Sequence, residues 1–232
     1  MILERLEKSK GQYISGEVLA TECHVSRNAI WKAVSELRNS GYQIESVNNK
    51  GYCLSVDCDI ISEEALRRWI TTPIYVYKEI DSTNTEAKRL LINSDRAFVH
   101  GSLIIALTQS AGRGHSRSRF NSPDGGIYLS IILEPDKMKS GSKNISHYIV
   151  KSVAAVLERE LGISLIIKDK GRIYQGSRKI CGILTEGISD METGEYSNYI
   201  AGIGILTENI KSEKKIDKNK LIASVFKCVL EK

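Results

Sequence analysis

One segment of the chain, 108–126, combines residues that could bind an anion. It reads TQSAGRGHSRSRFNSPDGG and holds four glycines and three arginines. Glycines let the backbone amides approach a ligand closely. Arginine side chains can form two parallel hydrogen bonds to a carboxylate or a phosphate. The composition therefore predicts an anion-binding loop, although an ordinary surface loop would have the same composition.

Strands and helices on either side must position this loop. Apolar runs at 102–107 and 126–133 predict buried strands directly before and after it. Further strands are expected at 74–77, 164–167, 172–174, 179–184 and 199–205, and helices at 62–70, 83–91, 150–161 and 221–229. Strands and helices mixed in this order predict an α+β domain, here 62–232, with a mixed or mainly antiparallel sheet.

The first 58 residues predict a separate small domain. Two short amphipathic helices precede a third at 26–38, which Ser26 can cap and Gly41 can end. Two β-like runs follow, 42–47 and 51–56, and the intervening Asn-Asn-Lys-Gly is typical of a turn. This order is the plan of a winged helix-turn-helix, which we assign to residues 1–58.

A winged helix-turn-helix places its second motif helix in the DNA major groove. We therefore predict a DNA-binding surface at the start of that helix and at the hairpin tip: Ser26, Arg27, Asn28, Lys32 and Lys50. Residues 1–58 contain seven basic and seven acidic residues, so any DNA footprint depends on how the charges are arranged. The alternative is a small helical interaction domain with solvated charges.

Composition and charge exclude several classes of protein. Charged residues make up 26% and hydrophobic residues 41% of the chain, as in globular proteins. No apolar run reaches the roughly 18 residues that a membrane-spanning helix needs. The N-terminus is amphipathic and carries two acidic residues, so it does not resemble a signal peptide. Five scattered cysteines without metal-ligand spacing predict reduced thiols, no metal site and a cytoplasmic location. The net charge of +5 permits a nucleic-acid partner without requiring one.

Several short motifs, taken in order, resemble the biotin protein ligase family. They are Asp81-Ser-Thr-Asn84, Gln109-Ser-Ala-Gly-Arg-Gly114, Ser122-Pro-Asp-Gly125, Arg178-Lys-Ile-Cys-Gly-Ile-Leu-Thr-Glu186 and Gly202-Ile-Gly-Ile205. The N-terminal domain is also similar to that of the branch in which a ligase doubles as the biotin operon repressor. The resemblance covers nearly the whole chain. It implies a class II synthetase-like α/β domain with a mixed sheet behind the winged helix-turn-helix.

The resemblance also implies an activity and a set of residues. The family forms biotinyl-5′-AMP from biotin and ATP–Mg²⁺ and passes biotin to a lysine of a carrier protein. In the repressor branch, the adenylate promotes homodimerisation and operator binding. The matching positions for biotin binding are Ser82, Thr83, Asn84, Gln109, Gly112, Arg113, Gly114, Lys179 and Gly182. Lys179 would also be the catalytic residue of an active ligase. We expect Asp81 and Glu186 to cap turns rather than to pair with basic loop residues.

The sequence departs from the family pattern where the nucleotide would bind. The pattern Gly-Arg-Gly-Arg-x-Gly-Arg-x-Trp has His115, Arg117, Ser118 and Phe120 at its last four defined positions. The family's Lys-Trp-Pro-Asn-Asp is Lys168-Asp169-Lys170-Gly171-Arg172 here, Leu206 replaces an asparagine, and the chain stops before the family's small C-terminal domain. Arg117, Arg119, Lys170 and Arg172 could serve as new anion ligands or form a solvated rim.

Three hypotheses remain. The first is a DNA-binding regulator that senses biotin through a degenerate ligase domain. The second is a divergent but active biotin–carrier-protein ligase. The third is a pocket adapted to another small acid or adenylate, for which lipoate and octanoate are natural trial ligands.

Overall fold

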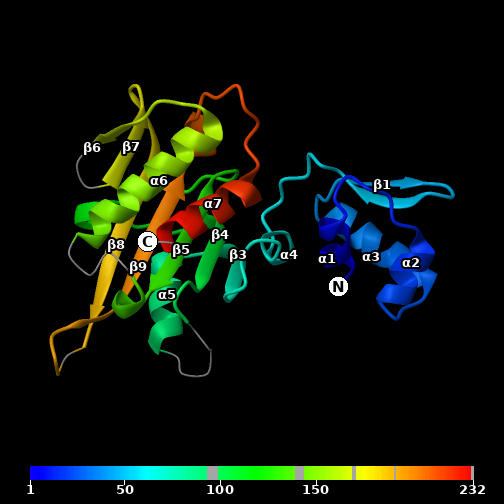
Figure 1. The fold of residues 1–232 in the computed structure, drawn as a ribbon, viewed down its shortest axis with the longest axis horizontal. Coiled ribbons are helices and arrows are strands. Elements are labelled where there is room, and N and C mark those ends of the chain that lie inside the picture. The colour runs from blue at the N-terminus through cyan, green and yellow to red at the C-terminus, as the bar shows by residue number, and fades with distance from the viewer. Residues whose placement is uncertain (93–98, 139–143, 169–170, 191, 231–232) are drawn as a thin grey trace. The chain divides into compact units, whose positions relative to one another are not determined.

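The computed structural model divides the chain into two compact units, Met1–Trp69 and Ile70–Lys232 (Figure 1). The structure describes residues 1–92, 99–138, 144–168, 171–190 and 192–230, and the Arg117 side chain also lies outside the description. The division differs from the expected ranges in the segment 62–69. That segment joins the first unit because its short helix packs against the N-terminal helix.

The first unit contains the expected winged helix-turn-helix order. Its elements are α1 (Ile2–Lys8), α2 (Gly16–Glu22), α3 (Arg27–Asn39), β1 (Ile44–Val47), β2 (Gly51–Leu54) and α4 (Glu63–Leu66). Leu6, Leu19, Ile30, Val34 and Leu54 are buried together and form the centre of its core. The apolar stripe of α3 therefore faces inward, which leaves its polar side to solvent.

Side chains of known capping types fix the two helices of the DNA-binding motif. Ser15 Oγ accepts a hydrogen bond from Val18 N, and Ser26 Oγ accepts one from Ala29 N, each at 3.1 Å. Arg38 joins α3 to the hairpin because its guanidinium donates to Ile44 O at 2.8 Å and to Ser46 Oγ at 2.6 Å. The orientation of the hairpin relative to α3 is thus held by hydrogen bonds as well as by packing.

The second unit is built on a seven-stranded sheet in the order β3-β4-β5-β9-β8-β7-β6. Its strands are β3 (Ile74–Ile80), β4 (Leu103–Gln109), β5 (Ile127–Leu133), β6 (Ile166–Lys168), β7 (Arg172–Gln175), β8 (Arg178–Ser189) and β9 (Tyr196–Ile205). Only the β3–β4 pair among these strands is parallel. The mixed, mainly antiparallel sheet predicted from the sequence is confirmed.

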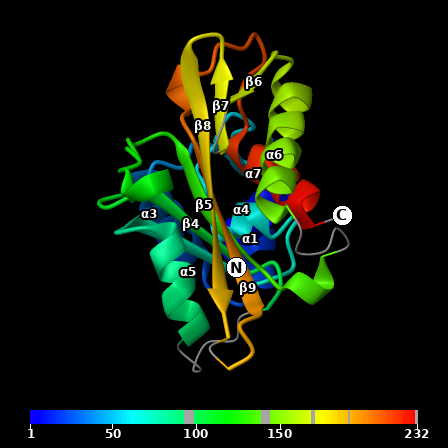
Figure 2. The same cartoon turned by 90° about the vertical axis from the view of Figure 1, so that its left-hand side faces the viewer.

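Three helices cover the two faces of this sheet (Figure 2). Helix α5 (Thr83–Ile92) packs on one face, where Ala87 and Leu90 contact Ile104, Ile132 and Ile200. Helices α6 (Ile145–Leu161) and α7 (Lys218–Leu230) pack together on the other face. Next to the start of α5, the loop after β4 lies over the same face of the sheet, and this is where a ligand could approach.

Strand alternation explains the different character of the two faces. Successive residues of a strand point to opposite sides, so positions 200, 202 and 204 of β9 face α5. Beyond Ile200 these positions are Gly202 and Gly204, and in register with Gly204 lies Gly182 of β8. The opposite side of β9 carries Ala201, Ile203 and Ile205, which are buried. One face is therefore a conventional apolar core and the other has a shallow glycine-lined area.

Several element boundaries differ from expectation, and two of them have an identifiable structural context. Helix α4 ends at Leu66, four residues before the expected end, and the chain continues in turns. Strand β8 is twice as long as the apolar pattern indicates, running on to Ser189, because its polar half still pairs with β9. Register with a neighbouring strand, rather than local hydrophobicity, determines where this strand ends.

Candidate functional site

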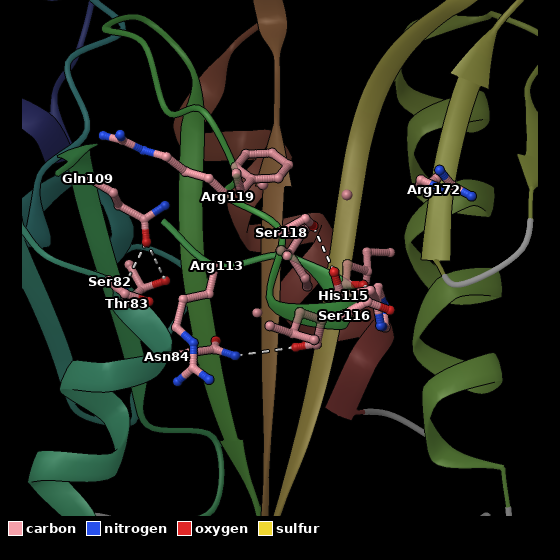
Figure 3. A pocket seen from close by; sticks show the side chains of 18 of the residues that line it. Ser82, Thr83, Asn84, Gln109, Arg113, His115, Ser116, Ser118, Arg119 and Arg172 are labelled. Atoms are coloured by element: carbon pink, nitrogen blue, oxygen red, sulfur yellow. Dashed lines mark hydrogen bonds between the residues drawn. The ribbon is translucent and has the colours of Figure 1, made fainter. Parts of the chain in front are cut away.

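A cavity of about 280 Å³ lies on the glycine-lined part of the sheet (Figure 3). It is bounded by the start of α5, the end of β4, the loop after β4, the start of β7, the first half of β8 and the end of β9. The lining residues are Ser82, Thr83, Asn84, Gln109, Arg113, Gly114, His115, Ser116, Ser118, Arg119, Phe120, Arg172, Lys179, Gly182, Ile183, Leu184, Gly202, Ile203 and Gly204. The wall thus combines hydrogen-bonding groups with cationic groups: Arg113 lies beside Asn84, and Arg172 lies across the cavity from them (Figure 3).

Gln109 links the strand β4 to the start of α5. Its Oε1 accepts hydrogen bonds from Thr83 N at 2.8 Å and from Thr83 Oγ1 at 3.3 Å, and its Nε2 donates to Ser122 Oγ at 2.8 Å. The first-turn amides of a helix lack partners within the helix, so this contact satisfies one of them. Ser82, Thr83 and Ser122 are all buried. The glutamine side chain is therefore held in one orientation at the cavity wall.

Hydrogen bonds to three other residues fix the side chain of Asn84. Ser130 Oγ donates to its Oδ1 at 2.6 Å, while its Nδ2 donates to Glu186 Oε2 at 2.8 Å and to Leu184 O at 3.4 Å. The residue is only 3% exposed and lies over the Cα of Gly202, where a Cβ would overlap its amide. Its polar atoms thus have protein partners, and the asparagine shapes the cavity by joining α5 to three strands.

Glu186 anchors this arrangement through charge. Lys88 Nζ lies 2.7 Å from Glu186 Oε1 and Arg113 Nη2 lies 3.5 Å from the same oxygen. Burial alone would raise the pKa of Glu186, but hydrogen bonds from Lys88 and Asn84 and the nearby charges outweigh it, and the pKa is lowered. The expectation that Glu186 caps a turn is wrong: it pairs with a basic loop residue. Asp81 does accept from Ser82 N, at 2.8 Å, and pairs with Arg89.

The arginine–glycine loop folds back on itself beside the cavity. Arg113 and Arg119 form an isolated antiparallel bridge, and Gly114 N donates to Ser118 O at 2.8 Å. Ser116 has the left-handed backbone angles φ 54° and ψ 40°, which are uncommon for a residue other than glycine. His115 Nε2 lies 2.8 Å from Ile183 O, so the loop is attached to β8.

Phe120 occupies the space that the strand glycines leave. Its ring atoms lie 2.6 Å and 2.5 Å from where a Cβ would stand at Gly182 and Gly204. Gly182 therefore accommodates an aromatic side chain of the protein itself. The Lys179 ammonium lies 4.8 Å from the centre of the same ring, as in cation–π pairs. Burial lowers the pKa of Lys179, and the neighbouring positive charge of Arg172 adds to this effect.

Most of the predicted ligand-binding residues meet at this cavity. Eight of the nine line it, namely Ser82, Thr83, Asn84, Gln109, Arg113, Gly114, Lys179 and Gly182. The ninth, Gly112, belongs to the same loop, where its carbonyl accepts a hydrogen bond from Phe120 N at 2.8 Å and a Cβ would overlap Phe120 O. Arg119 and Arg172, expected either as anion ligands or as a solvated rim, also line the cavity. Asp169 and Lys170, and the Arg117 side chain, lie outside the described residues.

Residues outside the predicted set complete the site. Ser122, Ser130 and Glu186 orient Gln109 and Asn84, and Gly202 and Gly204 supply part of the floor. The two glycines belong to the motif Gly202-Ile-Gly-Ile205, so their alternation on a strand could have indicated them. The partners of Asn84 lie 46 and 102 positions away, and no local pattern indicates such contacts.

In the first unit, the predicted DNA-contacting residues lie on one helix and on the hairpin. Arg27, Asn28 and Lys32 are exposed on the polar side of α3. Ser26 caps the helix through its side-chain oxygen. Lys50 is exposed in the hairpin turn, and its ammonium lies 5.9 Å from the centre of the Tyr13 ring. These positions leave three polar side chains of α3 accessible to a partner.

Two absences concern the described part of the chain. Within it, no group of three or more His, Cys, Asp or Glu residues is placed to hold a metal ion. None of its helices is long and apolar enough to cross a membrane.

The fold and the cavity define a helix-turn-helix unit followed by a biotin-ligase-type sheet domain. Residues 1–53 match the family described as "HTH domain", and residues 76–205 match the "Biotin/lipoate A/B protein ligase family". The bifunctional ligase/repressor BirA of Bacillus spizizenii is 31% identical over 228 residues, which cover 96% of this chain and 69% of that protein. BirA of Escherichia coli is 30% identical over 200 residues, covering 85% and 60%. The chain belongs to the biotin/lipoate A/B protein ligase family.

Solved structures share the fold at lower identity. A biotin protein ligase from Aquifex aeolicus in complex with biotin and ATP has a TM-score of 0.55 and 23% identity, over 69% of this chain and 70% of that one. The biotin acetyl coenzyme A carboxylase synthetase from Helicobacter pylori with bound biotinylated ATP has a TM-score of 0.58 and 21% identity, over 69% and 75%. The resemblance stated from the motifs is thus confirmed at the level of family and fold.

Proposed function

We propose that this protein is a DNA-binding transcriptional regulator that senses biotin, or a closely related small acid, through a degenerate ligase domain. The convergence of Ser82, Thr83, Gln109 and Lys179 on one cavity carries this proposal. A fused-ring urea needs paired donors and acceptors, and a carboxylate needs a cation. The cavity offers hydroxyl and amide groups together with a half-buried ammonium.

The N-terminal unit supports the DNA-binding half of the proposal. Its third helix exposes Arg27, Asn28 and Lys32, which are suited to phosphates and base edges. The relatives from Bacillus spizizenii and Escherichia coli are named as bifunctional ligase/repressors. We further propose that the regulator acts in the cytoplasm as a homodimer that spans two operator half-sites, with ligand favouring the dimer.

The nucleotide side of the cavity favours sensing over catalysis. His115 stands where the family pattern has arginine, and its Nε2 is engaged with Ile183 O at 2.8 Å. Arg172 lines the cavity where the family pattern has an acid, which reverses a charge. Losing one such contact to a transition state typically costs about 10²–10³ in rate. Several losses together would leave little adenylation.

A titration tests the sensing proposal. Biotin is titrated into the full chain in a calorimeter, with K179M as the test variant and K211M as a control at an exposed lysine outside the cavity. We expect saturable binding by the wild type and by K211M, and weak or no binding by K179M. If biotin gives no heat of binding while lipoate or octanoate does, the cavity is adapted to another small acid and biotin is not the ligand.

The alternative function is an active biotin–carrier-protein ligase. The half-buried Lys179 favours it, since a fixed positive charge beside the ligand carboxylate would stabilise the negative charge that develops when biotin reacts with ATP. Biotin would displace pyrophosphate from ATP to give biotinyl-5′-AMP, and Mg²⁺ would be held largely by the phosphates. Biotin-dependent release of pyrophosphate, followed by transfer of biotin to a carrier-protein lysine, would establish this function. It would also refute the proposal that the ligase domain has lost its activity.

A further inference from the structure

An exposed indole stands among the predicted DNA-contacting residues. Trp31 of α3 is 59% exposed, whereas its neighbour Ile30 is completely buried and Val34 is 1% exposed. The helix is therefore packed against the core through a different face, and the indole contributes little to that packing. Large aromatic side chains with accessible area are enriched at contact sites, where they contribute much of the binding energy.

The groups around Trp31 suit a polyanion. Trp31 follows Arg27 by four residues and Asn28 by three, so both lie one helical turn away on neighbouring positions. Lys32 is the next residue, and all three are exposed. The first turn of α3 contains no acidic residue, and the positive end of the helix dipole lies there. An apolar ring surrounded by basic and amide side chains is complementary to a partner surface that is negatively charged overall and contains one exposed apolar group.

The DNA major groove has one such point. Among the base edges exposed there, only thymine presents an apolar group, its 5-methyl. We propose that Trp31 is a specificity residue that packs its indole against a thymine methyl in the major groove. Arg27 and Lys32 would hold the helix by phosphate contacts, which carry no sequence information. This inference rests on the proposed DNA-binding function and assigns a role within it to a residue outside the predicted contact set.

Spectroscopy can follow this contact because the chain has only two tryptophans. The variant W69F leaves Trp31 as the single tryptophan. The probe is a duplex that the wild-type protein, with biotin present, selects from a randomised pool. We expect Trp31 emission to shift in proportion to the fraction of duplex bound, as measured independently by the anisotropy of a labelled duplex.

A substitution series then tests base specificity. Each thymine of the selected duplex is replaced in turn by uracil, which lacks only the 5-methyl group. For the wild type we expect one position per half-site to lose about tenfold in affinity, equivalent to about 1.4 kcal/mol. W31A should bind the original duplex about tenfold more weakly and be indifferent to the same replacement. W31F should retain part of the effect, and circular dichroism should show both variants folded.

A matched control separates the indole from the charges. K32A should weaken binding of thymine and uracil duplexes equally, because a phosphate contact does not depend on the methyl group. Unchanged affinity of W31A together with no uracil-sensitive position would overturn the inference while leaving DNA binding intact. A change of oligomeric state in W31A without a change in duplex affinity would assign Trp31 to a protein contact and also overturn it. Failure to select any duplex would refute the proposed function itself.

Discussion

Replacing Gly202 by alanine should disturb the cavity more than adding a methyl group at any other position of β9. A Cβ at this position would overlap Asn84 Oδ1 and lie 2.9 Å from Asn84 Cγ. Asn84 is 3% exposed and is tied to Ser130, Glu186 and Leu184, so it cannot move without losing hydrogen bonds.

The size of the effect follows from those bonds. Losing the neutral bond to Ser130 would cost about 1 kcal/mol and losing the bond to the Glu186 carboxylate about 2 kcal/mol. Overpacking of a core position typically costs about 1–3 kcal/mol. Since Asn84 can retain part of its bonding after a small shift, we expect the free energy of unfolding of G202A to fall by about 2 kcal/mol, and biotin binding to weaken at least tenfold.

The matched control is the same substitution two residues further on. At Gly204 a Cβ would stand 2.5 Å from the Phe120 ring, which belongs to a loop rather than to a helix. G204A should therefore cost about 1 kcal/mol or less. Urea unfolding followed by circular dichroism gives both values, and hydrogen exchange of the β9 amides localises the change. If G202A is as stable as the wild type and binds biotin equally well, Asn84 does not have the positioning role assigned to it.

Perturbations of three further residues, Glu186, Lys179 and Ser26, have defined outcomes. Glu186 has a lowered pKa, so the ionised carboxylate stabilises the folded protein above the ordinary pKa of 4.5, and this stabilisation is lost as the pH falls below that value. E186Q should therefore flatten the acid side of the stability–pH curve. An unchanged curve would show that the ion pairs of Glu186 contribute nothing to stability. K179M should abolish the preference for biotin over neutral biotinamide, which we expect to be about 10–100-fold in the wild type, and a preference that survives would place the carboxylate elsewhere. Because burial lowers the pKa of Lys179, the ammonium loses its proton before a rising pH reaches the ordinary lysine value of 10.5, and wild-type affinity for biotin should fall over that rise. S26A should lower stability by about 1 kcal/mol, while S26D should keep the cap and lose DNA affinity; equal loss of stability in both would contradict the capping role of Ser26.

Local signals in the sequence predicted the elements that have local causes. Ser26 and Gly162 mark helix ends because a hydroxyl satisfies a free amide and because glycine accepts the left-handed angle φ 66°. Strand β5 was predictable because every one of its residues is buried. The end of β8 was not, since its polar half is held by pairing with β9 rather than by its own pattern.

The same distinction applies to the site. Motif order identified eight of the residues that line the cavity, because a family resemblance carries information about distant contacts. It did not indicate that Asn84 is saturated by Ser130 and Glu186, or that Phe120 fills the space above two glycines. These contacts depend on side chains that the sheet brings together from distant parts of the sequence, so local residue spacing does not predict them.

Coupling between the cavity and DNA is the claim on which the functional account depends. The direct measurement is the affinity of the full chain for the selected duplex, by anisotropy, without biotin and with biotin at a concentration that calorimetry shows to saturate the cavity. We expect biotin to tighten duplex binding by the roughly 5–150-fold typical of allosteric coupling. Equal affinity at zero and full occupancy would contradict it.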